Sequence, residues 1–129
     1  MVDAICANAA FADSFRREMN EIFPESRLEP IPADHEMFTT AFGGTDLSNV
    51  ARREPQARGT GDRADARLRR GPPELEGIKV GPDGRYAVIF SKYDLSCALE
   101  KHDSVECEGY PREDAEKIAI NVLLYSLLK

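Results

Sequence analysis

The carboxyl-terminal stretch, from Gly84 to Lys129, constrains the fold more than any other part of the chain. A β-branched and aromatic run at residues 85–91 is followed by a polar loop and then by a long apolar helix that begins near Pro111. This succession is typical of one strand–loop–helix unit of an α/β protein. In open α/β sheets, ligands bind beyond the carboxyl ends of such strands. The sequence therefore predicts an α/β fold and a place for a site, without naming a substrate.

Size and charge exclude several classes of protein. The 129 residues suffice for one domain, which we expect to span residues 1–129. A formal net charge of −6 gives the molecule no attraction for nucleic acid. The most apolar stretch, residues 118–128, falls short of the about 20 residues that a membrane span requires. Three cysteines cannot all pair within the chain, which favours a reducing, cytoplasmic location, although a parent protein could be membrane-anchored.

Local patterns predict a helix and a hairpin. Asn8 can cap a helix over about residues 10–23, whose apolar side chains recur at helical spacing. Residues 81–84, Gly-Pro-Asp-Gly, predict a tight turn because glycine allows positive φ and proline presets φ. We therefore expect residues 75–80 and 85–91 to form a β-hairpin.

The last helix is apolar on nearly all sides. At 100° per residue, one face holds Ala115, Ile118, Ala119, Val122 and Tyr125, and the opposite face holds Ile120, Leu124, Leu127 and Leu128. A helix with this pattern is buried on nearly all sides. We expect a buried C-terminal helix, covered either by another copy in a homo-oligomer or by the remainder of a larger chain.

Residues 51–73 have a different composition. They hold seven arginines against three acidic residues, and glycines and prolines interrupt them. We expect a flexible, arginine-rich surface loop. An RNA-binding arm is the alternative, but no aromatic residues are interleaved for base stacking, so no nucleic-acid partner is expected.

Several sequence blocks occur in order along the chain. They are FADSFRREM at 11–19, IFP at 22–24, LEP at 28–30, DH at 34–35, LEGI at 75–78, GRYAVI at 84–89, YDL at 93–95, GY at 109–110, DA at 114–115 and NVLLY at 121–125. With these blocks the chain resembles a bacterial family described as domain of unknown function 4159. Lys92 departs from the family's usual proline, and Pro111 departs from its usual helix-capping Ser or Thr.

This resemblance implies a fold similar to class I glutamine amidotransferases: a three-layer, flavodoxin-like α-β-α sandwich with a mostly parallel sheet. It also implies that the chain is the carboxyl-terminal half of such a domain. No activity is established for the family. Its members are often joined to membrane-anchored or helical-repeat segments.

Cys6 is the strongest candidate for a catalytic residue. It follows a short β-prone run and precedes the first helix, and a helix N-terminus lowers a thiol pKa. The related amidotransferases present their nucleophile at such a turn, and His102 is the candidate base. The alternatives are a buried, inert cysteine and a histidine in a solvated loop. The turn at Cys6 lacks the glycines that surround the nucleophile in those enzymes.

The cysteines also suggest a metal site. The spacing Cys97-x4-His102-x4-Cys107 provides three of four zinc ligands, and Cys6 can supply the fourth if the sheet brings it close. A Cys97–Cys107 disulfide is the alternative in an oxidising compartment. His35, between two acidic residues, is interpreted as a turn residue.

The favoured function is a non-catalytic ligand-binding or protein-interaction module. Asp94 follows a predicted strand at its carboxyl end, where polar groups face ligands, although it can instead cap a turn. Tyr93, Asp94 and Tyr110 are the predicted ligand-binding residues. A thiol-dependent amide or ester hydrolase and a structural zinc module are the alternatives, and zinc is the one cofactor considered.

Overall fold

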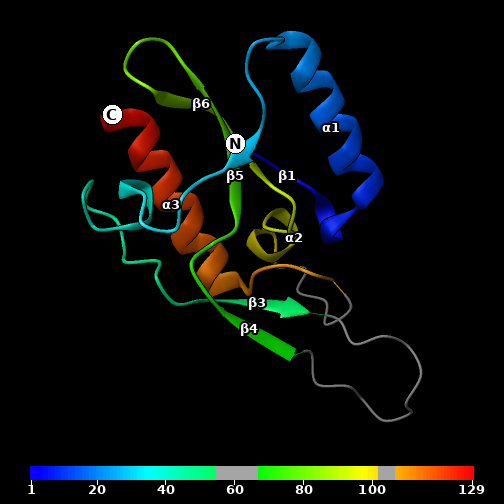
Figure 1. The fold of residues 1–129 in the computed structure, drawn as a ribbon. Helices are drawn as coiled ribbons and strands as arrows, with labels where there is room; N and C mark the ends of the chain where they lie inside the picture. Colours follow the sequence, from blue (N-terminus) through cyan, green and yellow to red (C-terminus); the bar gives the residue numbers. More distant parts are fainter. Residues whose placement is uncertain (55–66, 102–106) are drawn as a thin grey trace.

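The computed structural model describes residues 1–54, 67–101 and 107–129, which form a mixed α/β fold (Figure 1). The strands are β1 (Val2–Asp3), β2 (Glu29–Pro30), β3 (Val50–Glu54), β4 (Arg67–Gly71), β5 (Leu75–Val80) and β6 (Arg85–Ser91). The helices are α1 (Ala9–Ile22), α2 (Ser96–Leu99) and α3 (Arg112–Leu128), with 3₁₀ turns at Ile5–Ala7 and Glu36–Phe38. None of the helices in these ranges is long and apolar enough to cross a lipid bilayer.

The main sheet has the strand order β1-β6-β5-β2. Among the described strands only β1 and β6 run parallel, whereas β6–β5 and β5–β2 are antiparallel. The predicted mostly parallel sheet is therefore wrong. The reason lies in the predicted turn, where Gly81 and Gly84 adopt φ of +72° and +61° and reverse the chain between β5 and β6.

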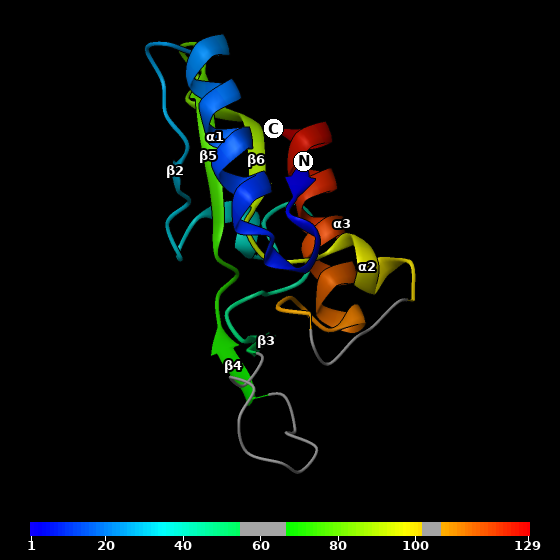
Figure 2. The same cartoon turned by 90° about the vertical axis from the view of Figure 1, so that its right-hand side faces the viewer.

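Helices cover both faces of this sheet. Figure 1 shows α1 and α3 on opposite sides of β5, and in Figure 2, which is turned by 90°, α1 lies in front of this strand. Alternate residues of β6 pack against the helices on the two faces of the sheet, because successive side chains of a strand point to opposite faces. Phe90 packs with Ala4, Ala12 and the stacked ring of Phe15, while Ile89 belongs to the larger core under α3.

The predicted first helix and hairpin are confirmed. α1 begins one residue earlier than expected, and the side chain of Asn8 accepts a hydrogen bond from the Phe11 N–H at 2.9 Å. β5 and β6 pair over their full lengths, from Leu75 opposite Ser91 to Val80 opposite Arg85.

Within this chain α3 is buried on one face only, so burial on nearly all sides still requires the predicted cover by a second copy or by the remainder of a larger chain. Ala115, Ile118, Val122 and Tyr125 face the core as predicted. The opposite face stays open because the sheet and the segment around Glu36–Phe38 lie on the inner side of α3 alone.

The two ends of the arginine-rich stretch are strands, so the loop expectation is corrected there. β3 and β4 pair antiparallel and form a ribbon at one end of the molecule (Figure 1). Glu54 contacts both Arg52 at 3.3 Å and Arg69 at 3.1 Å, which offsets the repulsion between cross-strand arginines. Residues 55–66 lie outside the described residues.

Candidate functional site

The parallel pair β1–β6 brings two of the predicted site residues together. Val2 pairs with Phe90 and Asp3 with Ser91, so the segments that leave both strands start from the same edge of the sheet. Cys6 follows β1 and Asp94 follows β6. The backbone N–H of Cys6 donates to Asp94 Oδ1 at 3.2 Å. The carboxyl ends of these strands therefore form a polar junction of the kind that the fold class predicts.

Cys6 occupies a tight strand-to-helix turn. Its φ of +50° and the φ of +54° at Ala7 lie in the left-handed region, which non-glycine residues rarely adopt. This is the turn expected for a nucleophile. However, Cys6 is bonded to Cys107 in a disulfide, with 4.6 Å between their Cα atoms. His102, the candidate base and zinc ligand, lies outside the described residues.

The disulfide corrects the pairing considered from the sequence. Cys107 bonds to Cys6, while Cys97 is a free, partly buried thiol. The pKa of the Cys97 thiol is raised, first by desolvation and then by Asp94. Cys97 is therefore held in its protonated form, unlike a reactive thiolate.

Asp94 is the buried centre of the junction. Its side chain is 1% exposed, and Oδ2 has no hydrogen-bond partner among the described residues. Its backbone N–H donates to Glu108 O at 3.1 Å, and its carbonyl accepts from Tyr110 N at 3.0 Å. Gly109 is required beside it, because a Cβ there would lie 2.6 Å from Asp94 Cβ. The two segments are thus fixed side by side.

The sulfur atoms of Cys6 and Cys107 and a carboxylate oxygen of Asp94 all lie within 4.8 Å of one another. The zinc set predicted from the sequence included both of these cysteines. Cys97 does not belong to this group, and Asp94 takes its place.

Asp3 was missed by sequence reasoning. Its Oδ2 accepts from the N–H groups of Leu95 at 2.8 Å and Ser96 at 2.9 Å, and its Oδ1 accepts from Ser96 Oγ at 2.5 Å. These bonds satisfy donors at the start of α2 and fix the segment that follows Asp94. The sequence offered no signal for this role beyond the type of residue.

Tyr93 and Tyr110, the other predicted ligand residues, take part in packing around Arg52. The guanidinium of Arg52 lies 3.8 Å from the ring centre of Tyr93 and forms ion pairs with Glu108 at 2.7 Å and Glu74 at 3.1 Å. Tyr110 is 1% exposed, and its hydroxyl accepts from Glu74 N at 2.9 Å. Burial raises the pKa of Tyr110. Tyr110 lines a small pocket of about 100 Å³ together with Arg52 and Glu74.

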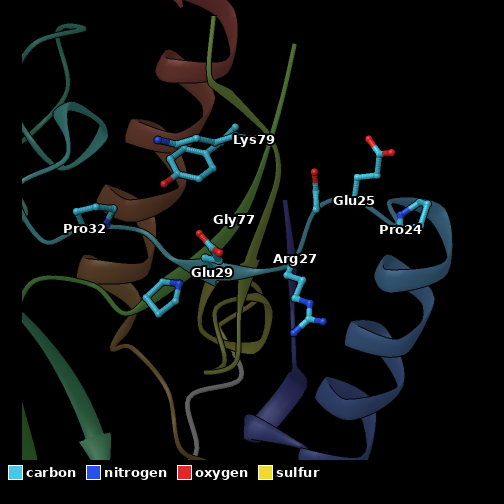
Figure 3. Close-up of a pocket in the computed structure, with 10 residues that line it drawn as sticks. Pro24, Glu25, Arg27, Glu29, Pro32, Gly77 and Lys79 are labelled. Atoms are coloured by element: carbon cyan, nitrogen blue, oxygen red, sulfur yellow. The ribbon is translucent and has the colours of Figure 1, made fainter. Parts of the chain in front are cut away.

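An open groove of about 630 Å³ lies elsewhere, between the end of α1, β2 and β5. Figure 3 shows Lys79 and Glu29 on one side of it and Pro24 and Glu25 on the other. Lys79 Nζ lies 5.1 Å from the ring centre of Tyr86, which is packed on Gly77. The groove mixes both signs of charge and contains none of the predicted site residues.

His35 is a turn residue, as predicted. Its Nδ1 accepts from Met37 N at 3.1 Å, and its ring contacts Tyr86 and Tyr125 edge-on. Desolvation by the surrounding rings lowers its pKa from the usual 6.5.

Comparison with known proteins places the chain in a family. No curated protein and no solved structure matches it. Residues 1–127 match the family described as Domain of unknown function (DUF4159). The match covers nearly the whole chain, which therefore belongs to the DUF4159 family.

Proposed function

We propose that the chain is a non-catalytic protein-interaction module whose contact surface is the outer face of α3. The observation that carries this proposal is the exposure of Ile120, Leu123 and Leu127, which are 53%, 57% and 71% exposed. Their spacing of i, i+3 and i+7 places them on one side of the helix. A contiguous apolar stripe on a surface helix is typical of a contact between proteins.

The partner that fits this stripe is a second copy of the chain, with its α3 antiparallel to the first. The charged side chains near the ends of α3 are paired within the chain, Lys117 with Glu113 and Asp114, and Lys129 with Glu36, so the apolar stripe is left as the contact surface. In an antiparallel pair the stripe of one copy packs on the same stripe of the other, and the helix dipoles oppose each other favourably. Burying each Leu or Ile contributes about 1.5–3 kcal/mol, so the stripe supplies most of the affinity.

The other functions considered from the sequence have less support. For a small-ligand module, the predicted residues Asp94 and Tyr110 are both 1% exposed. For a thiol hydrolase, the strained turn at Cys6 is favourable, but its sulfur is bonded to Cys107.

The test compares Leu123→Glu with Leu68→Glu in sedimentation velocity over a range of protein concentrations. Leu68 lies on β4 and is 48% exposed, so it is a matched apolar-to-acidic control away from α3. We expect a monomer–dimer equilibrium for the unaltered chain and for Leu68→Glu, and a shift toward monomer of at least about tenfold in dissociation constant for Leu123→Glu.

Far-UV circular dichroism establishes that both variants keep their helices. An unaltered chain that stays monomeric at all concentrations contradicts the proposal, as does a dimer that Leu123→Glu leaves intact. A loss of dimer in both variants would place the contact elsewhere.

A further inference from the structure

We propose that Cys6, Cys107 and Asp94 form a binding site for a soft divalent cation of the zinc type, which the protein loads when the two cysteines are reduced. This site lies at the junction beyond β1 and β6 and is independent of the α3 surface. Each residue offers one ligand atom, and the three atoms lie within 4.8 Å of one another. A tetrahedral ion with bonds of about 2.0–2.3 Å separates its ligand atoms by roughly 3.3–3.8 Å, so the two sulfur atoms, which are bonded to each other in this structure, must move apart after reduction.

The unpartnered oxygen of Asp94 is a separate indication of a cation. A buried carboxylate oxygen without a partner is costly, and native proteins rarely leave one. Asp94 Oδ1 accepts from the Cys6 N–H at 3.2 Å, whereas Oδ2 is buried and has no partner among the described residues. A metal ion bound at Oδ2 would satisfy this atom.

The surroundings hold these ligands in place without the metal. The backbone of Asp94 is hydrogen-bonded to the segment at residues 108–110 through both its N–H and its carbonyl group. The Cys6 N–H that bonds to Oδ1 orients the carboxylate, a supporting contact of the kind that tunes metal ligands. Cys6 is exposed while Cys107 and Asp94 are buried, so the ion can enter from the Cys6 side and keep water as its fourth ligand.

The ligand types select the metal class. Two thiolates favour zinc and related soft ions over magnesium and calcium, which prefer oxygen ligands. The three ligands carry a formal charge of −3, which a divalent cation largely neutralises. A cation of this class therefore fits the site better than a hard one.

Loading requires that the disulfide first be reduced. A phosphine reductant and water convert the Cys6–Cys107 bond into two thiols, and the phosphine leaves as its oxide. Binding of the divalent ion then displaces one proton from each thiol, because thiolates are the metal ligands. Oxidation and metal binding therefore exclude each other at this pair of sulfur atoms.

The test measures zinc binding to the full chain, by equilibrium dialysis and elemental analysis, before and after phosphine reduction. We expect one zinc per reduced chain and none above background in the oxidised chain. Asp94→Asn keeps an oxygen that can accept from the Cys6 N–H, and we expect it to weaken binding by at least about tenfold. Cys107→Ser should abolish tight binding, whereas Cys97→Ser keeps both ligand thiols and should bind zinc at least about ten times more tightly than Cys107→Ser.

A second measurement does not depend on the folding of any variant. Zinc added to the reduced, unaltered chain should slow alkylation of Cys6 and Cys107, read by mass spectrometry, and leave the rate at Cys97 unaffected. The proposal is overturned if the reduced chain binds no zinc, if Asp94→Asn binds as tightly as the unaltered chain, or if zinc protects Cys97 as strongly as the other two cysteines.

Discussion

At the level of single residues, polar side chains join segments of this molecule that are distant along the sequence. Asp3 bonds to the start of α2, and Asp94 joins the turn at Cys6 to the segment at Gly109. In a single sequence, an aspartate with such a role looks the same as an aspartate on the surface. The two differ only in their hydrogen-bond partners, which lie far away along the chain. The sequence thus predicted that Asp94 follows a strand, but it did not predict Asp3.

His35 makes folding sensitive to pH. Its pKa is lowered in the folded state, so the unfolded chain binds the proton more tightly. The contribution of His35 to stability is complete above the usual pKa of 6.5 and is lost as the pH falls through the lowered value. Protonation also removes the Nδ1 acceptor that Met37 N uses.

We therefore expect the urea midpoint to fall more between about pH 7.5 and about pH 5 in the unaltered chain than in His35→Asn. Asparagine can still accept the Met37 N–H, so the variant isolates the titration. Equal slopes against pH for the two proteins would contradict this account.

Among the elements, periodicity and turn chemistry predicted those that carry a local signal. α1, α3 and the hairpin of β5 and β6 follow from helical spacing, an Asn cap and paired glycines. β3 and β4 escaped prediction because their arginines have no apolar alternation, and their pairing depends on ion pairs with Glu54. The sequence also did not specify β6 as the parallel partner of β1, since a two-residue contact between segments about 88 positions apart leaves no local pattern.

Asn121 of α3 fixes the loop at residues 37–45 by hydrogen bonds. The side-chain amide of Asn121 donates to the carbonyls of Met37, Thr39 and Thr45, and its oxygen accepts from Thr45 N. The sequence showed Asn121 only as a polar interruption in an apolar helix.

We expect Asn121→Ala to lower the free energy of unfolding by about 1–3 kcal/mol, because it leaves the buried carbonyl of Met37 and the partly buried carbonyls of Thr39 and Thr45 without this donor. Asn20→Ala on the exposed side of α1 is the matched control, with an expected change within about 0.5 kcal/mol. Urea denaturation measures both. A cost no greater for Asn121 than for Asn20 would show that the loop does not depend on this amide.

At the scale of the whole molecule, the disulfide ties the turn after β1 to the segment before α3. Cys6 and Cys107 are 101 positions apart, so the bond closes most of the chain into a loop. Restricting the unfolded chain in this way stabilises the folded state by about 4.7 kcal/mol in the chain-entropy account for a loop of this length, and disulfides typically contribute about 2–4 kcal/mol.

We therefore expect metal-free reduction to lower the urea midpoint of the unaltered chain and of Cys97→Ser equally. Cys107→Ser, which lacks the bond from the start, should show no further change on reduction. If reduction left the midpoint of the unaltered chain where it was, the bond would not contribute to stability.

The outer edge of β2 is poorly suited to pair with a strand of another molecule. The N–H of Ile31 points inward and donates to Leu75 O at 2.8 Å, so the positions on either side point outward. Both of these are prolines, Pro30 and Pro32, which have no N–H. A strand from another molecule would find no donors at these positions, so this edge resists the edge-to-edge addition that begins amyloid-like aggregation.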